Sequence, residues 1–261
     1  MNFTEKESFD FNDLVEIMKF LRAPGGCPWD MVQTHESIRS NFIEETYEVI
    51  EAIDTKDSEL LKEELGDVLL QVVFHAEMSA EENDFDINDV INGICKKLVV
   101  RHPHVFGDVK ADNSADALKS WDDVKMQTKS QKKQSEAMDS VSKALPSLMR
   151  AAKIQQKAAK VGFDWDDVSG PLDKIVEETN ELKTAIQNGD AENQAEELGD
   201  LLFSVVNVSR FLKVDSEKAL YDACDKFTDR FRALETLAAE RGIDVKTASL
   251  SELDSLWDEV K

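Results

Sequence analysis

The strings EETNELKTAI at residues 177–186 and EELGDLLFSVV at 196–206 decide how this sequence folds, because each of them occurs twice. EETYEVIEAI at 44–53 matches the first string, and EELGDVLLQVV at 63–73 matches the second. Both matches are separated by 133 residues, and two long blocks held at one interval are not expected by chance. Solenoid repeats recur every ~20–50 residues, so this longer interval predicts two tandem copies of one domain.

Between the copies lies a segment of different composition. The residues at 125–140, KMQTKSQKKQSEAMDS, are polar, basic and nearly free of aliphatic side chains. Such a composition is typical of a linker or a solvated helix. We therefore expect a first domain at 1–125, a linker at 126–144 and a second domain at 145–261.

Apolar residues in the second copy follow the spacing of an amphipathic helix. From Leu172 to Ile186 they recur every three or four positions, after a Ser-Gly-Pro start at 169–171 and before an Asn-Gly-Asp stop at 188–190. The next helix is expected at 191–211, and its apolar residues on most sides predict a central, buried position.

Two further helical patterns follow in the second copy, at about 216–241 and 249–261. In the first copy, Thr55-Lys-Asp57 is the expected end of the corresponding first helix. Glycine and proline are scarce, with 10 and 5 residues, which argues against the many turns of a sandwich or barrel. The predicted fold is all-α, with one four-helix bundle in each copy.

Acidic residues occur inside the predicted core helices. Glu178 and Glu181 share a helix face at i, i+3, and Glu197 and Asp200 do the same on the next helix. If the two helices are antiparallel, the four carboxylates converge, and burying unpaired anions together is costly unless a cation joins them. Carboxylate oxygens are preferred ligands of Mg²⁺. The first copy supplies a matching set for the same metal: Glu45, Glu48, Glu64 and Asp67.

An EExxE string alone also occurs on solvated helix faces of any highly charged protein. Here the string is accompanied by an ExxD string in an apolar run, at an interval from Glu48 to Glu64 that equals the interval from Glu181 to Glu197. The repetition of the whole arrangement favours a metal site over a solvated surface.

Basic and aromatic residues near the end of the second copy could bind a phosphorylated ligand that carries a ring. Lys226 and Arg230 lie at i, i+4 on one helix face, as do Trp257 and Lys261. An indole can stack on a base while an ammonium group meets phosphate. The alternatives are an ordinary surface pattern for the two cations and packing of the terminal helix for Trp257.

Composition excludes several classes of function. Acidic residues outnumber basic ones by 54 to 31, and a net charge of −23 repels nucleic acids and anionic lipid, so neither is an expected partner. No apolar run approaches the ~18 residues that span a bilayer, and the first residues do not resemble a signal peptide. Three scattered cysteines fit a reducing compartment, so a cytoplasmic location is expected.

Several motifs together resemble those of the MazG proteins. They are GGCPWD at 25–30, RHPHVFGD at 101–108, VGFDWDD at 161–167 and the repeated EExxE and ExxD pairs. MazG proteins are all-α nucleoside triphosphate pyrophosphohydrolases, related to dimeric dUTPases and phosphoribosyl-ATP pyrophosphohydrolase. The resemblance covers nearly the whole chain in the two-domain bacterial form.

This resemblance implies hydrolysis of NTPs and dNTPs to the monophosphate and pyrophosphate, with Mg²⁺ or in its place Mn²⁺, by a homodimer in a house-cleaning or stress-related role. By position, it implies that the second-copy metal ligands are Glu178, Glu181, Glu197 and Asp200. The implied nucleotide-binding residues are Lys174, Glu177, Glu178, Glu196, Lys226, Arg230, Trp257 and Lys261, and Glu177, Lys226 and Arg230 are the implied catalytic ones.

The motifs do not say which copy is active, although the second is favoured because a helical pattern continues after its cation pair. A rival interpretation is a non-enzymatic acidic helical module that binds partner proteins, with one or both metal sites silent. That rival explains the charge and the helices, but not the repeated acids in an apolar run. A phosphoribosyl-ATP or dUTP hydrolase is a nearer rival, and its expected single domain argues against it.

Overall fold

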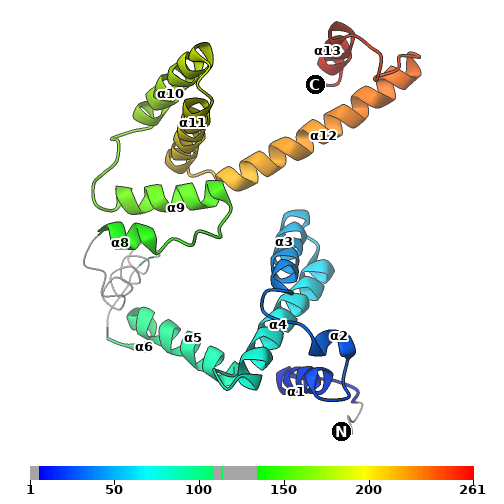
Figure 1. The fold of residues 1–261 in the computed structure, drawn as a ribbon, viewed down its shortest axis with the longest axis vertical. Coiled ribbons are helices and arrows are strands. Elements are labelled where there is room, and N and C mark those ends of the chain that lie inside the picture. Colours follow the sequence, from blue (N-terminus) through cyan, green and yellow to red (C-terminus); the bar gives the residue numbers. More distant parts are fainter. Residues whose placement is uncertain (1–5, 109–112, 114–133) are drawn as a thin grey trace. The chain divides into compact units, whose positions relative to one another are not determined.

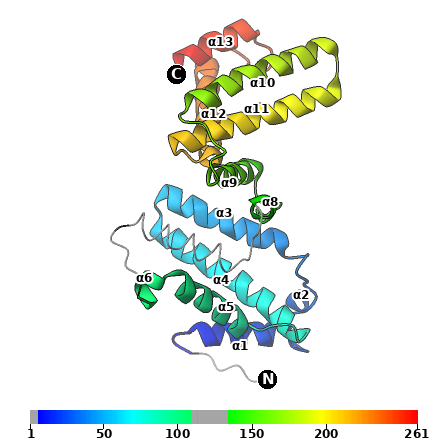
Figure 2. The same ribbon diagram turned by 90° about the vertical axis from the view of Figure 1, so that its left-hand side faces the viewer.

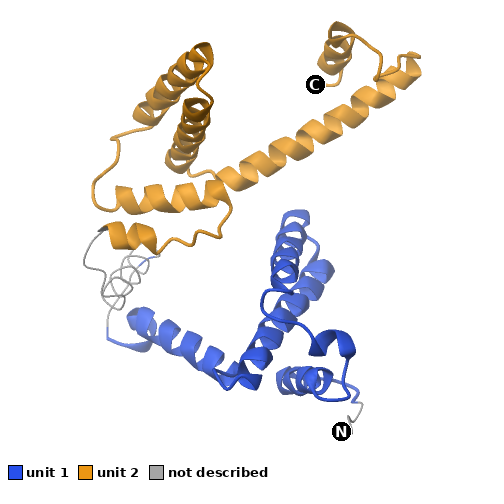
Figure 3. Cartoon of the chain, in the orientation of Figure 1, with its two compact units in different colours: residues 1–128 blue, residues 129–261 orange. Residues whose placement is uncertain are grey.

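Two separate helical units make up the chain in a computed structural model that describes residues 6–108, 113 and 134–261. Unit 1 comprises residues 1–128 and unit 2 comprises residues 129–261 (Figure 3). All regular elements in the described ranges are helices, which confirms the predicted all-α class. None of these helices is long and apolar enough to cross a membrane.

Unit 1 is built around an antiparallel hairpin of two long helices (Figure 2). They are α3 (Arg39–Thr55) and α4 (Ser58–Glu81). The other described helices of the unit are α1 (Phe11–Arg22), α2 (Pro28–Met31), α5 (Ile87–Arg101) and α6 (Pro103–Phe106). The core forms where α1 packs against α4, around Met18, Val73 and Phe74.

Unit 2 repeats the hairpin with α10 (Ser169–Asn188) and α11 (Ala191–Leu212) (Figure 1). Its other described helices are α8 (Gln134–Asp139), α9 (Ser147–Ala159), α12 (Ser216–Glu240) and α13 (Leu250–Glu259). A small core joins the last two of these helices through Leu234, Ala238 and Leu256.

Both hairpin turns use the stop signals that the sequence predicts. Helix α10 ends at Asn188, and Gly189 follows with φ 68°, a left-handed conformation that glycine adopts without strain. Helix α3 ends at Thr55, where Lys56 takes the corresponding left-handed conformation at φ 59°. Asp57 and Asp190 then accept backbone N–H bonds at the start of the returning helix. The tight turns bring the acidic stretches of each helix pair side by side.

The predicted four-helix bundle is not closed within unit 2. Among its described residues, α12 contacts α9, α11 and α13, but no Cα atom of α12 lies within 8 Å of α10. In Figure 1, α12 extends away from the hairpin. The hairpin and α12 therefore keep apolar side chains exposed, among them Val176, Leu202, Leu220 and Phe227.

The predicted linker at 126–144 is covered only in part. Residues 126–133 lie outside the described residues, as do Trp121 and Lys125, which correspond in the repeat to Trp257 and Lys261. Residues 134–139 form α8, which contacts α9.

Candidate functional site

The hairpin of unit 2 brings carboxylates from both of its helices together. Glu178 of α10 and Glu197 and Asp200 of α11 each offer an oxygen, and these oxygens lie within 4.8 Å of one another. Glu178 is buried, with 3% of its surface exposed. The i, i+3 spacing directs Glu197 and Asp200 to the face of α11 that meets α10. The convergence expected from the sequence is therefore present.

A second group overlaps the first through Glu178. Oxygens of Glu177, Glu178 and Glu181, all on α10, also lie within 4.8 Å of one another. The Nζ atom of Lys174 lies 2.5 Å from Glu178 Oε1 and 2.9 Å from Glu177 Oε1. The hydrogen bonds that Lys174 donates to Glu178 and then to Glu177 raise the pKa of Lys174, so the lysine stays positively charged beside the acids.

The carboxylates of this site repel one another. Burial, followed by hydrogen bonding and charge from Glu178, raises the pKa of Glu181 above its ordinary value. Burial, followed by charge from Glu181 and Glu178, raises the pKa of Glu197. A divalent cation would remove this repulsion. In the described part of the chain, these groups offer oxygen ligands alone, a donor set that suits a hard cation.

Unit 1 contains a similar group on α3 and α4. Oxygens of Glu45, Glu48 and Glu64 lie within 4.8 Å of one another, and Glu64 is buried. Burial and then neighbouring acids raise the pKa of Glu45 and of Glu64. Asp67, a predicted ligand, is not in this group among the described residues. Its charge still raises the pKa of Glu45, so it lies near the group without joining it.

The predicted nucleotide-binding cations are not brought to the carboxylates within one chain. Lys226 and Arg230 lie in the middle of α12, and Lys226 is exposed. Helix α12 contacts α9, α11 and α13 but not α10, so among the described residues these cations are not brought to Glu178 and Glu181 inside the unit. Glu196 is exposed on α11, next to the carboxylate group.

Trp257 and Lys261 are also held away from the acids. The ring of Trp257 lies 5.1 Å from the ring of Phe227 on α12, so this indole packs between α12 and α13. Lys261 Nζ lies 2.7 Å from Asp258. Among the described residues, α13 has no close backbone contact with α10 or α11. Within the chain, Trp257 therefore packs against α12, and its contact with a nucleotide stays a prediction.

Residues that were not predicted as site residues line a cavity beside the carboxylates. The cavity has a volume of about 260 Å³, and Trp165, Phe203, Ser204 and Asn207 lie on its wall together with Glu178 and Asp200. The sequence held two signals for it: the recurrence of PWD at 28–30 as DWD at 164–166, and a polar Ser-x-x-Asn pattern inside the apolar run of α11.

An arginine attaches the DWD segment of unit 2 to α11. Arg210 donates both of its terminal nitrogens to the carboxylate of Asp164, with an Nη1–Oδ2 distance of 2.9 Å. Its Nε donates to Asn207 Oδ1 at 2.9 Å. Because Trp165 follows Asp164 directly, this bridge fixes the indole next to the hairpin.

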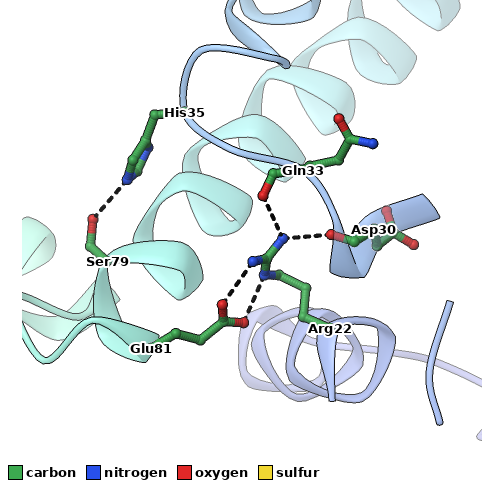
Figure 4. A network of polar contacts seen from close by, with 6 residues as sticks. All are labelled: Arg22, Asp30, Gln33, His35, Ser79 and Glu81. Carbon is green, nitrogen blue, oxygen red and sulfur yellow. Dashed lines mark hydrogen bonds and ion pairs between the residues drawn. The ribbon is translucent and has the colours of Figure 1, made fainter. Parts of the chain in front are cut away.

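Unit 1 holds its PWD segment with a different arginine (Figure 4). Arg22 of α1 donates Nε and Nη2 to the Glu81 carboxylate, each at 2.7 Å. Its Nη1 donates to the backbone carbonyls of Asp30 and Gln33. The guanidinium also lies 5.3 Å from the ring centre of Phe74. Only 7% of the arginine side chain is exposed, so this is an interior tie between α1, α2 and α4.

Comparison with known proteins identifies similar sequences over almost all of the chain. The profile of the MazG nucleotide pyrophosphohydrolase domain matches residues 33–106 and 170–234. A Thermotoga maritima protein named nucleoside triphosphate pyrophosphohydrolase/pyrophosphatase MazG is 48% identical over 96% of this chain and 95% of its own length. The Escherichia coli K12 nucleoside triphosphate pyrophosphohydrolase is 44% identical over 95% of each chain. Bacillus subtilis YabN, named as uncharacterized, is 48% identical over 97% of this chain and 52% of its own.

Proposed function

The chain belongs to the MazG family of nucleotide pyrophosphohydrolases, and we propose that the α10–α11 hairpin of unit 2 carries its active site. Relatives that align with it over 95% of their own length are named nucleoside triphosphate pyrophosphohydrolases, and the chain is therefore one as well. The proposed reaction converts an NTP or dNTP to the monophosphate and pyrophosphate. The observation that carries the assignment is the meeting of Glu178, Glu197 and Asp200 at a face that also presents a charged lysine.

Magnesium is the proposed cofactor, with manganese as a substitute. Glu178, Glu197 and Asp200 would hold one ion, and Glu181 together with Glu177 or Glu178 offers oxygens for another. When bound, such ions neutralise phosphate charge and lower the pKa of a coordinated water. In the first copy, Glu45, Glu48 and Glu64 form the corresponding proposed ligand set.

The side chains around the acids have separate proposed roles. Lys174 remains protonated between Glu177 and Glu178, so its ammonium group can bind a phosphate oxygen at the edge of the site. Glu177 is exposed and is the proposed acceptor of the proton from the attacking water. Positive charge fixed near the triphosphate stabilises the negative charge that develops during bond breaking.

A second copy of the chain is proposed to supply the missing cations. Lys226, Arg230, Trp257 and Lys261 do not reach the hairpin of their own chain, which leaves the predicted nucleotide site incomplete. The exposed apolar residues of α10, α11 and α12 fit a second copy that closes a four-helix bundle around the acids. A homodimer would thereby place Lys226 and Arg230 of one chain opposite Glu178 and Glu197 of the other.

Subunit mixing tests this composite site. One chain carries Glu197→Gln and the other carries Lys226→Ala with Arg230→Ala, and both carry Glu64→Gln to silence the first copy. Each homodimer is expected to be inactive, whereas random mixing should restore roughly a quarter of the wild-type activity, since half of the dimers regain one intact site. Failure of the mixture to regain activity, with dimers confirmed by mass, would contradict the shared site.

The activity itself is tested on the wild-type chain with a panel of standard and damaged NTPs and dNTPs. Products are identified by mass, with Mg²⁺, with Mn²⁺ and after chelation. Metal-dependent release of a monophosphate and pyrophosphate is expected, and release of inorganic phosphate instead would overturn the proposed reaction. Preferential hydrolysis of damaged nucleotides would support the proposed house-cleaning role.

A further inference from the structure

A second cavity lies in unit 1, between α1 and α4. It has a volume of about 480 Å³, within the ~300–1,000 Å³ range of most small-molecule sites. Its lining comes from the last two turns of α1, the two residues that follow this helix, and the last two turns of α4. Along α4, the lining residue Glu77 is about 20 Å from Glu64 of the carboxylate group, at a rise of ~1.5 Å per residue. The cavity is therefore separate from the proposed metal site.

Part of the lining is apolar. Phe20 belongs to it, together with Ala23 and Pro24 in the turn that follows α1. Phe20 and Ala23 are only half-buried, so each keeps some apolar surface in contact with water. A ligand whose methylene groups covered these side chains would gain affinity from the hydrophobic effect.

The two cations of the lining already have acidic partners. Lys19 Nζ lies 3.0 Å from Glu16 Oε1. Arg22 donates Nε and Nη2 to the two oxygens of Glu81, each at 2.7 Å (Figure 4). Such a two-point bond between a guanidinium and a carboxylate is strong and fixed in direction. Neither cation is therefore required to balance a further acid of the cavity.

A third acid of the lining, Glu77, lacks a partner of this kind. In the part of the chain that the structure describes, no hydrogen bond or ion pair reaches its carboxylate. Burial raises the pKa of Glu77 above its ordinary value, although charge from Lys19 acts in the opposite direction. The cost of holding this half-buried charge is thus not fully offset inside the unit, and a cation that entered the cavity would offset it.

The corresponding position of unit 2 carries the opposite charge. At the 133-residue interval, Glu77 corresponds to Arg210, whose guanidinium is paired with Asp164. The unpaired acid is therefore a property of unit 1, and not of the helix pair that both copies share.

The lining indicates the chemistry of a ligand. A positive charge is needed to meet Glu77, and an aliphatic chain is needed to cover Phe20 and Pro24. A hydrated metal ion would meet the acid but leave the apolar surface in contact with water, whereas an anion would be repelled by the acid. An ammonium group on an unbranched aliphatic chain satisfies both parts of the lining.

We propose that the cavity between α1 and α4 binds an aliphatic ammonium ion, with its charged group on Glu77 and its methylene chain on Phe20 and Pro24. Free polyamines and the lysine side chain of another protein both carry this chemistry. The proposal is independent of the proposed function, because the cavity shares no residue with the proposed active site.

Calorimetric titration of the full-length chain with 1,4-diaminobutane tests the proposal. Saturating Mg²⁺ occupies the carboxylate groups of the two hairpins, and salt at about 150 mM screens the general attraction of an acidic chain for cations. We expect one diamine to bind per chain. The alcohol 1,4-butanediol, which has the same chain without the charge, should not bind.

Two variants locate the bound diamine. Glu77→Gln keeps the size of the side chain and removes its charge, so it should weaken binding about ten-fold, the loss typical of one charged hydrogen bond. Ala23→Phe fills the space beside the aliphatic chain, leaves every charge in place and should also weaken binding. The matched control is Glu59→Gln, which removes the same charge from an exposed pair with Lys62 at the other end of α4 and should leave the affinity unchanged.

Equal affinity of the wild type, Glu77→Gln and Ala23→Phe would overturn the proposal, because the diamine would then bind to the acidic surface in general. The absence of binding to the wild type would overturn it as well. A parallel titration with Nα-acetyl-lysine methylamide distinguishes the two sources. Tighter binding of this lysine derivative than of the diamine would indicate a protein side chain, and weaker binding would indicate a free polyamine. None of these outcomes depends on hydrolysis of an NTP.

Discussion

The two hairpins share their acids but differ in the residues beside them. At the 133-residue interval, Glu178 and Asp200 correspond to Glu45 and Asp67, whereas Lys174 corresponds to Asn41. Asn207 in the cavity of unit 2 corresponds to Phe74, which is 4% exposed in the core of unit 1. The carboxylate groups proposed to bind metal are therefore present twice, but at these corresponding positions only unit 2 has the amide and the lysine.

The two units also use different arginines to hold the segments PWD at 28–30 and DWD at 164–166. In unit 2, Arg210 of α11 attaches the loop by reaching Asp164, and it also orients Asn207. In unit 1 the residue that corresponds to Arg210 is Glu77, and Arg22 enters from α1 instead. The Arg22 interactions connect the helices around the core of unit 1, whereas the Arg210 interactions hold residues that line a cavity in unit 2. Similar loops thus contribute to a packed core in one copy and to the wall of a cavity in the other.

The largest expected effect separates the two carboxylate groups. Glu197→Gln should lower the rate of pyrophosphate release by about a hundred-fold or more, because it removes a proposed metal ligand. Glu64→Gln, its counterpart in unit 1, should change the rate far less if unit 2 carries the activity. Steady-state rates for the two variants measure the difference, with circular dichroism as the control for folding. Equal losses from both substitutions would break the proposed division between the copies.

Effects of intermediate size are expected from replacing the two arginines, and they should differ in kind. Arg22→Ala should lower the free energy of opening of α1 and α4 by about 2 kcal/mol, since it removes a buried guanidinium together with its charged hydrogen bonds to Glu81 and to two partly buried carbonyls. Amide hydrogen exchange in unit 1 measures this change. Arg210→Ala should instead raise the KM for NTPs, because it releases Trp165 and Asn207. Arg232→Ala is the matched control, since its pair with Asp229 is exposed and contributes little.

An unchanged KM in Arg210→Ala, together with a raised KM in Arg22→Ala, would contradict this prediction. It would show that the loop of unit 1, and not the loop of unit 2, affects NTP binding. An unchanged hydrogen exchange in Arg22→Ala would show that the interior tie does not stabilise unit 1.

The smallest expected effect is an acid sensitivity confined to unit 1. His75 stacks on His35 with ring centres 5.0 Å apart, and their Nδ1 atoms lie 2.7 Å apart. Burial, followed by charge from His35, lowers the pKa of His75 below its ordinary value of 6.5. The folded state thus binds this proton less readily than the unfolded state does. Stability is fully present above pH 6.5 and decreases as the pH falls through the lowered pKa.

Replacing His75 by valine, the residue found at the corresponding position 208, should remove this loss. Hydrogen exchange of α4 at pH 7.5 and 5.5, corrected for intrinsic rates, measures the effect, and α11 serves as the internal control. An equal loss of protection in the variant would exclude the histidine pair as its source.

Much of the fold followed from local sequence signals. The start at 169–171, the stop at 188–190 and the turn at 55–57 predicted both hairpins, and the structure confirms them. Seven of the eight predicted metal ligands lie in carboxylate groups, with Asp67 outside. These features were predictable because i, i+3 spacing and a tight turn act over a few residues.

The proposed binding residues are harder to predict from the sequence. Lys226 and Trp257 occur at suggestive spacings, but spacing along one helix does not say which helix that face will meet. Asn207 lies in an otherwise apolar run, which hides it, although the first copy has Phe74 at the corresponding position. A residue that changes from apolar to polar between two copies was the available signal.

The sequence by itself determined the duplication, the helices and the gathering of acids in each hairpin, because those depend on neighbours along the chain. Only the tertiary structure decided that Trp165 and Asn207 line one cavity, since they are 42 residues apart and meet through Arg210, Asp164 and the space left at Gly170. It also decided that α12 contacts α9, α11 and α13 but not α10, because the pattern along one helix does not say which other helices it will meet.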